Sequence, residues 1–526
     1  MSRSLVILNN AIASYARLAV AAASGFFTIP IVLHKLGPTD YGIFSLIAGT
    51  VSILLFVNGA LTTGAQRHIA FSLGEGKMDE VGKWFSASLL VHLAVAASVL
   101  VVGFLSSHWV IYKLLSIPLG RQQASVWIYL LVIILLAVNI VATPYHAFLM
   151  ARESLVPLSL MAIASSLYLL AGVATLRFLP GDALLWYSGI YISSQLILFA
   201  GPMLFCLAKF PECRRLDFGL NREKKIRELL SFSGWNLFGA LAVQIRYQGP
   251  AILLNRFIGT TANAANGIAM QVNTFASSLS TGLIRATSPA IVKSEAAGDR
   301  GMVLLTSNLS SKYGFIFLWL MMGPVVCELR YCLGLWLRDV PPNTEVFATA
   351  LLIALLIDML TAGLMASVQA YGRLAAYQII IGILICSSVP LGYLALRWDM
   401  PASSVMWALV AASVFSGVGR VAFVSRTLGL RVSDWWRTVV IPSVVIGTVC
   451  SVLMGSMMLL LRTGLERVAV LYLLNSVATL ALTWLLAANE LERSLLRRHA
   501  TNSLNLVRSG LLFVSSKRAA FQNPSA

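Results

Sequence analysis

The chain has 526 residues, of which 58% are hydrophobic and only 11% are charged, and its mean hydropathy is +0.81. Soluble globular domains carry about 25% charged residues, so the composition excludes an ordinary soluble protein and indicates a membrane protein. The formal net charge is +18. It does not indicate nucleic-acid binding, because Lys and Arg are concentrated in alternate loops rather than in one patch.

A helix that crosses a bilayer needs about 20 mainly apolar residues. The sequence contains about fourteen such stretches, and the segments between them are too short to fold as separate domains. This pattern predicts an all-α polytopic membrane protein. The predicted spans cover residues 11–33, 41–63, 85–107, 125–148, 155–177, 184–208, 232–256, 264–286, 313–335, 346–369, 375–396, 402–424, 438–460 and 467–488.

The basic loops fix the expected orientation. The positive-inside rule places the first residues in the cytoplasm, and an even number of spans returns the C-terminus to the same side. The stretch after MSRS is long and lacks a small-residue cleavage site, so we expect it to be the first span rather than a signal peptide.

No motif predicts catalysis or metal binding. The six cysteines form no CxxC pair, which favours buried apolar side chains over disulfides or a metal site. The patterns GxxxxGK[ST], GxSxG and HExxH do not occur, so we expect no ATP hydrolysis, no enzymatic activity, no catalytic residues and no cofactor.

The chain divides into two similar halves at the basic segment 209–229. With an offset of 222 residues, Leu36-Gly37 aligns with Ile258-Gly259, and Gly76 aligns with Gly298. Transporters are commonly built from two such repeats, with the substrate path at their interface. We therefore expect two pseudo-symmetric six-helix lobes and two extra C-terminal helices. The expected parts are an N-lobe at 1–210, a basic cytoplasmic loop at 211–229, a C-lobe at 230–426, the two extra helices at 427–488 and a cytoplasmic tail at 489–526.

Two motifs in the N-terminal half carry a family resemblance. They are LGPTDYGIFSL (36–46) and GALTTGAQRHIA (59–70), which leads to a GEGK turn. With these motifs, the chain resembles bacterial polysaccharide flippases, the O-antigen (Wzx-type) and exopolysaccharide translocases of the multidrug/oligosaccharidyl-lipid/polysaccharide (MOP) exporter superfamily. Within the first motif, Gly37-Pro38 predicts a tight turn, and Thr39 or Asp40 is expected to cap the following helix.

The resemblance implies a transporter of the bacterial cytoplasmic (inner) membrane. It would translocate a polyprenyl-diphosphate-linked oligosaccharide, such as an O-antigen, capsule or exopolysaccharide repeat unit, by alternating access. The implied partners are this substrate, membrane lipids, a polysaccharide polymerase and glycosyltransferases, with H⁺ or Na⁺ as a coupling ion. Two alternatives from the same superfamily stay open, a drug or metabolite exporter and a peptidoglycan-precursor flippase. A membrane glycosyltransferase or ligase is disfavoured, because the outer loops hold few acids for acid–base chemistry.

Arg246 lies near the centre of the predicted span 232–256. A charge in hydrocarbon costs at least ~2.5–3.5 kcal/mol on insertion scales, so the side chain is expected to face the protein interior or a wet cavity. Two hypotheses follow. The guanidinium contacts the substrate diphosphate or an acidic sugar, since Arg pairs with such oxygens bidentately, or it forms a structural ion pair with a membrane acid. We favour the first.

Other polar residues within spans are candidates for the same cavity. Gln244 and Gln248 lie on the other side of the helix from Arg246, where they can bond adjacent helices. Arg17 lies toward the inner end of the first span, where lining a cavity and snorkelling to the interface are equally expected. Arg420 is expected to snorkel. The candidate cavity residues are Arg246, Arg17, Gln244, Gln248, Asn266 and Asn273.

Asp358 is the only acidic residue deep in a predicted span. The sequence leaves two roles open. The carboxylate neutralises Arg246 or Arg17, or it binds the H⁺ or Na⁺ that drives the transport cycle.

Overall fold

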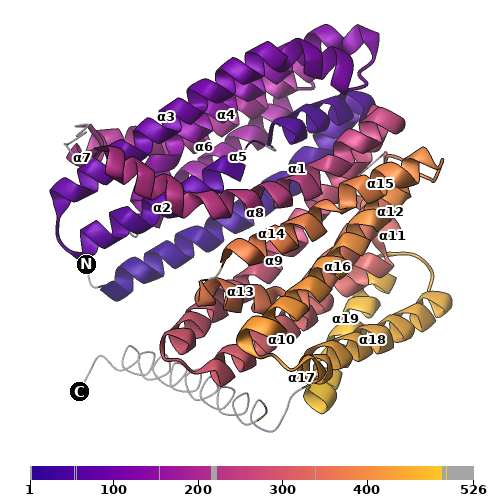
Figure 1. The fold of residues 1–526 in the computed structure, drawn as a ribbon. Coiled ribbons are helices and arrows are strands. Elements are labelled where there is room, and N and C mark those ends of the chain that lie inside the picture. The colour runs from indigo at the N-terminus through magenta and orange to yellow at the C-terminus, as the bar shows by residue number, and fades with distance from the viewer. Residues whose placement is uncertain are drawn as a thin grey trace, which may run out of the picture.

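The structure is a computed structural model that describes residues 3–52, 54, 56–152, 154–214, 222–337, 339–372, 374–487 and 493. Nearly all of these residues are helical, and no strand occurs within these ranges. The helices run along one elongated bundle (Figure 1). We call the end with the turns at Gly37, Gly181 and Gly259 the apical end. The opposite end, which has the N-terminus and the turns at Gly76 and Gly298, is the basal end.

The helices divide between the two lobes and a C-terminal pair. The N-lobe holds α1 (Arg3–Ser52), α2 (Phe56–Gly74), α3 (Met78–Trp109), η2 (Val110–Leu114), η3 (Leu119–Arg121), α4 (Gln122–Ala151), α5 (Leu155–Thr175) and α6 (Ala183–Lys209), followed by the short α7 (Pro211–Arg214). The C-lobe holds α8 (Arg222–Phe257), α9 (Thr260–Ala296), α10 (Arg300–Cys327), α11 (Leu329–Trp336), α12 (Thr344–Met359), α13 (Ala362–Tyr371), α14 (Leu374–Cys386), α15 (Ser388–Arg397) and α16 (Ser403–Leu428). The C-terminal pair is α17 (Val432–Trp435), η4 (Trp436–Val440) and α18 (Ile441–Leu460), then α19 (Leu465–Leu482) and η5 (Thr483–Ala487).

The predicted number of spans is confirmed. Within the described residues, 10 helical stretches are long and apolar enough to cross a membrane, or 11 if the bent pair α12–α13 is one span. The first stretch contains two helices that meet at Gly37, where the backbone is not helical. When α8 and α9, which are not among these stretches, are included, the described chain passes between the two ends of the bundle about fourteen times.

The two least apolar long helices lie inside the protein. α9 carries many Asn, Ser and Thr residues, and it packs against α1, α8, α10, α12 and α13. α8 lies between the lobes (Figure 1), and it contacts α1, α2 and α3 on one side and α14, α15 and α16 on the other. Protein neighbours therefore bury several polar side chains that lipid would not tolerate, among them Asn263, Asn266 and Asn273 of α9.

Residues 222–229, which the sequence assigns to the cytoplasmic loop, form the first turns of α8. Lys225 makes an ion pair with Glu80 of α3, and its ammonium group lies over the ring of Trp84. Leu229 is fully buried in an apolar cluster with Leu61 and Val91 of the N-lobe. α8 thus begins against the N-lobe and ends within the C-lobe.

The C-terminal pair α18–α19 is attached to the C-lobe chiefly through α10. Near the apical end, the buried carboxylate of Glu328 accepts a 2.7 Å hydrogen bond from Arg467 of α19. Further along α19, Asn475 donates to the carbonyl of Leu320 at 3.1 Å. At the basal end, the buried ammonium group of Lys312 donates to the carbonyl of Ala487 at 2.7 Å. These bonds hold the pair on the outside of the C-lobe.

The motif around Gly37 fastens the apical end of the N-lobe. Gly37 has φ +74°, which permits the turn after the first span. The carboxylate of Asp40 accepts a 2.6 Å bond from Arg121, whose guanidinium also reaches Asp182 at 2.7 Å. Asp182 in turn caps α6 by accepting from the Leu184 amide at 3.0 Å. Asp40, expected as a helix cap, therefore joins α1 to the start of α4 and α6.

The closest approach of the lobes occurs between α1 and α9. A Cβ atom on Gly42 would lie 2.0 Å from the carbonyl oxygen of Thr260 and 3.2 Å from the amide nitrogen of Ala264. One turn deeper, a Cβ on Gly267 would lie 2.9 Å from the hydroxyl of Ser45. Gly42 and Ala264 are separated by the 222-residue offset of the repeat, as are Ser45 and Gly267. The contact therefore lies where a two-fold axis between the repeats would pass.

We expect Gly42→Ala to lower the free energy of unfolding by about 1–3 kcal/mol, because the added methyl group forces the two helix backbones apart. Gly189→Ala in α6 is the matched control, since its Cβ would meet no atom within 4 Å and helix propensity alone favours Ala by about 0.5–1 kcal/mol. Thermal unfolding in detergent measures both variants. Equal melting temperatures for Gly42→Ala and wild type would contradict the close approach.

Candidate functional site

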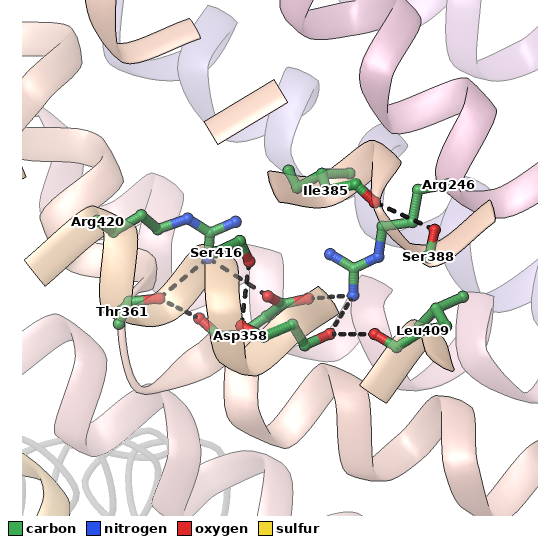
Figure 2. A network of polar contacts seen from close by, with 9 residues as sticks. Arg246, Asp358, Thr361, Ile385, Ser388, Leu409, Ser416 and Arg420 are labelled. Carbon is green, nitrogen blue, oxygen red and sulfur yellow. Dashed lines mark hydrogen bonds and ion pairs between the residues drawn. The ribbon is translucent and has the colours of Figure 1, made fainter. Parts of the chain in front are cut away.

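Arg246 is buried in the C-lobe and pairs with Asp358. The guanidinium, with 5% of the side chain exposed, lies 2.7 Å from the carboxylate of Asp358 on α12. The same nitrogen donates to the hydroxyl of Ser413 on α16 at 2.6 Å. Figure 2 shows the arginine reaching from α8 toward these groups. The sequence left open whether Asp358 would neutralise Arg246, and the structure places the two in contact.

A second arginine reaches the same carboxylate from the other side. Arg420 of α16 lies 3.3 Å from the second oxygen of Asp358 and donates to the hydroxyl of Thr361 at 3.0 Å. The expectation that Arg420 snorkels to the interface is wrong, because only 8% of its side chain is exposed. Figure 2 shows Arg420 and Arg246 on opposite sides of Asp358.

The break between α12 and α13 positions this network. The two helices meet at an angle of 48° across Leu360 and Thr361, one residue beyond the Met359 that follows Asp358. Thr361 stands in the break and donates to the backbone carbonyl of Asp358 at 3.3 Å. An irregular backbone at membrane depth is tolerated only where it is buried in protein, as it is here.

The network carries a formal charge of one positive unit, since two guanidinium groups share one carboxylate. Each oxygen of Asp358 already has a guanidinium partner. A cation that approached this carboxylate would therefore meet two positive charges as well as one negative charge.

Neighbouring helices occupy the space beside the small residues that flank Arg246. The sequence allows this face to approach either a helix or a ligand. A Cβ on Gly239 would overlap the side-chain amide of Gln378 of α14, and a Cβ on Gly249 would lie 2.4 Å from Val389 of α15. α14 and α15 therefore occupy this space.

Two neutral amides of the C-lobe reach glycines of α1 in the N-lobe. A Cβ on Gly49 of α1 would lie 2.6 Å from the side-chain oxygen of Gln248, and one on Gly25 would lie 3.1 Å from the side-chain nitrogen of Gln271. Both glutamines are half-buried and cross from the C-lobe to a glycine of α1. The other expected cavity residues lie nearby along these helices. Gln244 is half-buried on α8, while Asn266 and Asn273 are buried on α9.

Arg17 lies apart from the other candidates. It is half-buried on α1 in the basal part of the first span, and it forms no ion pair or hydrogen bond with any described residue. The structure thus brings Arg246 together with Asp358 and does not bring Arg17 to either of them.

A pocket of about 100 Å³ opens within the N-lobe, where the second span is interrupted between α1 and α2. It lies between the end of α1, the middle of α4 and the middle of α6. No sequence motif marks it, because its polar groups come from three separate helices and each has an ordinary apolar context. Its lining residues are Ala48, Val51, Ser52, Val132, Leu135, Leu136, Asn139, Tyr191, Gln195 and Phe199.

Two sets of hydrogen bonds join the lobes in their apical halves. The buried side chain of Asn255 at the end of α8 accepts from the Ser116 amide at 2.6 Å and donates to the Ser116 carbonyl at 3.0 Å. The indole of Trp336 at the end of α11 donates to the Phe26 carbonyl at 2.6 Å and stacks on the Phe26 ring. That carbonyl lacks its helical partner, because Pro30 stands four residues on.

The family model of polysaccharide biosynthesis proteins matches residues 7–295, which is more than half of the chain. The chain belongs to this family. The match covers the N-lobe, α8 and nearly all of α9. No curated protein sequence matches the chain.

The fold is that of MOP superfamily transporters. A structure described as the inward-facing conformation of a multidrug resistance MATE family transporter of this superfamily has a TM-score of 0.67 at 10% identity, covering 78% of this chain and 97% of that one. The lipid II flippase MurJ in an inward closed conformation has a TM-score of 0.69 at 11% identity, covering 90% and 97%. An outward-facing MATE transporter has a TM-score of 0.59 at 12% identity, covering 81% and 95%. This protein is thus a multi-pass membrane protein with the fold of these transporters.

We expect Asp358→Asn to destabilise the protein by about 3–5 kcal/mol, because it leaves two buried guanidinium groups without a counter-charge. Glu345→Gln removes an exposed carboxylate from the same helix and should stay within about 0.5 kcal/mol of wild type. The melting temperature and the amount of protein in the membrane measure both variants. A normally stable Asp358→Asn protein that fails only in transport would instead assign Asp358 to ion coupling.

We expect Asn255→Leu to open the apical end, because it leaves the amide and carbonyl of Ser116 unpaired at about 1–3 kcal/mol each. Spin labels on Leu119→Cys and Trp398→Cys, two exposed apical positions on different lobes, report the separation in a background without the native cysteines. The distance distribution should shift to longer values. An unchanged distribution would show that this contact does not hold the lobes together.

Proposed function

We propose that this protein is a flippase that moves a polyprenyl-diphosphate-linked oligosaccharide across the bacterial cytoplasmic membrane. The oligosaccharide would be an O-antigen, capsule or exopolysaccharide repeat unit. Membership of the polysaccharide biosynthesis family and the transporter fold support this proposal. Both termini would lie in the cytoplasm, so that the basal end faces the cytoplasm and the apical end faces outward.

The observation that carries the proposal is the guanidinium of Arg17, which has no ion-pair or hydrogen-bond partner in the part of the chain that the structure describes. It stands about 30 Å from the apical turn at Gly37 along α1, at the depth where the head group of a cytoplasmic-leaflet lipid would enter. A guanidinium inside a span is costly unless it faces water or an anion. A diphosphate supplies oxygens that Arg binds bidentately. Arg246 is less suited to this role, because it is buried within the C-lobe and already paired with Asp358.

The remaining geometry supports alternating access. The apical contacts at Gly42, Asn255 and Trp336 close the outward side between the lobes. The glutamines between the lobes offer neutral hydrogen-bonding groups to a sugar head group, while the polyprenyl tail stays in lipid. Breaking the apical contacts would let the lobes separate on the outward side and release the head group there.

The energy source is a separate proposal. A coupling role for Asp358 requires H⁺ or Na⁺ to compete with Arg246 and Arg420 for its two oxygens. We propose that Asp358 holds the C-lobe together and that transport follows the substrate gradient or an ion bound elsewhere. Glycosyltransferases would supply the substrate on the cytoplasmic side, and a polymerase would consume it on the other.

Two other functions from the same superfamily can be weighed against this one. A peptidoglycan-precursor flippase is suggested by the similarity in fold to MurJ, a lipid II flippase. A drug or metabolite exporter is suggested by the MATE structures. The polysaccharide family match favours a glycan lipid over both, and a free arginine rather than a free acid in the first span disfavours a cationic drug.

The leaflet distribution of the glycan lipid tests the proposal. Cells that lack this protein and any redundant flippase should hold the polyprenyl-diphosphate-linked glycan on the cytoplasmic face, where an external glycan-cleaving enzyme cannot reach it. Wild-type protein should restore cleavage. Arg17→Ala should slow it by about 10- to 100-fold, the loss of a charge-assisted contact.

Arg177→Ala is the matched control, because this exposed apical arginine stacks on Phe178 and pairs with no carboxylate in the described chain. It should restore cleavage fully. Arg17→Lys should recover only part of the rate, since an ammonium group keeps the charge without the bidentate geometry. An unchanged leaflet distribution without the protein would reject the function. Full rescue by Arg17→Ala would reject the role of Arg17.

A further inference from the structure

The pocket in the N-lobe presents unsatisfied hydrogen-bonding groups at the middle of the membrane. Gln195 and Tyr191 lie one turn apart on α6 and both line it. Neither the amide of Gln195 nor the hydroxyl of Tyr191 has a hydrogen-bond partner in the described part of the chain. Gln195 lies about 20 Å along α6 from the apical start of the helix, near the bilayer centre.

Such groups require a partner. An unpaired amide or hydroxyl in an apolar environment costs roughly 2–7 kcal/mol, so water or a ligand must reach the pocket. On the other walls, the hydroxyl of Ser52 donates its proton to the carbonyl of Gly49 and can still accept a hydrogen bond, and Asn139 adds an amide.

The side chains that line the pocket limit the kinds of ligand that it can bind. Among the described residues that line the pocket, none is charged, a histidine or a cysteine, which disfavours a phosphate, a cation or a metal. A polyprenyl chain would leave the amide of Gln195 and the hydroxyl of Tyr191 unpaired. The pocket combines amides, hydroxyls and an aromatic ring with the apolar walls of Leu136 and Phe199. A pyranose ring has the matching surface, with hydroxyl groups at its edge and C–H groups on its face.

We infer that this pocket binds one neutral sugar residue of the translocated head group. The amide of Gln195 and the hydroxyl of Tyr191 bond ring hydroxyls, and the ring face packs on the apolar wall. The volume of about 100 Å³ corresponds to about three waters, which the edge of one pyranose displaces. This inference rests on the proposed function for the identity of the complete substrate.

The position of the pocket suits such a role. Ser52 lies close along α1 to Gly49, where Gln248 of the C-lobe makes contact. A head group between the lobes therefore has a path of neutral amides from the interface into the pocket. The ring of Tyr191 is held in place by an edge-on contact with Phe44, at 5.1 Å between ring centroids. The diphosphate would remain at Arg17, on the basal side.

Transport by the full-length protein in proteoliposomes tests the inference. The probes are a long-chain polyprenyl diphosphate that bears one neutral hexose and the same lipid without sugar. Tyr191→Phe and Gln195→Leu should each lower the rate for the sugar-bearing lipid about 2- to 10-fold, the effect of one hydrogen bond, and leave the other lipid unchanged. Ser193→Ala is the control, because this hydroxyl bonds only its own helix at the Gly189 carbonyl.

Loss of transport for both lipids, or for neither, would overturn the sugar site. A wild-type protein that moves neither lipid would overturn the proposed function instead. A second measurement separates these failures. In a background without native cysteines, Gln195→Cys is labelled by a thiol reagent. Free hexose should slow the labelling several-fold while inorganic diphosphate does not. No protection by hexose, or equal protection by diphosphate, would overturn the inference.

Discussion

The carboxylate of Asp358 determines how the C-lobe is assembled. It joins α8, α12 and α16 at one point, through two guanidinium groups that come from opposite sides. Neither arginine could be buried at this depth without it, since an uncompensated charge inside a membrane protein costs several kcal/mol. The bend between α12 and α13 and the close packing of α14 and α15 on α8 are arranged around this contact. The most highly charged place in the transmembrane region is therefore a structural centre.

Charged and neutral polar groups lie in different parts of the membrane region. The buried charges stabilise the C-lobe, and the neutral groups lie along the proposed substrate path. The deeply buried arginines Arg246 and Arg420 are paired within the C-lobe, whereas two amides reach α1 between the lobes and amides, a hydroxyl and a phenol line the N-lobe pocket. Neutral groups bind a hydroxyl-rich head group reversibly, because the net free energy of each such bond is only about 1 kcal/mol. A transporter must release what it binds, so weak and numerous contacts suit the path better than a deep charge. Arg17, whose guanidinium has no ion-pair partner among the described residues, stands near the expected entrance.

Much of the fold follows from the sequence, because long apolar stretches and glycine turns have a direct physical meaning. The span count, the two lobes and the importance of the Gly37 turn were predictable in this way. The partner of Arg246 was one of two alternatives, and the choice required knowing which face of α8 meets α12. Arg420 was misjudged because its position along a helix suggests snorkelling, and only the tertiary packing shows the acid beside it. The N-lobe pocket was not predictable, since Ser52, Asn139 and Gln195 come from three helices with no shared pattern.

The proline at position 30 gives the apical closure an unusual property. It removes, permanently, the helical partner of the Phe26 carbonyl, and the other lobe supplies a replacement through the indole of Trp336. If the lobes separate there, this oxygen has no protein donor left to return to. Solvent must then take the place of the indole, so the crevice has to become wet as it forms. Dehydrating conditions would accordingly keep the apical side shut, even where every side chain is intact.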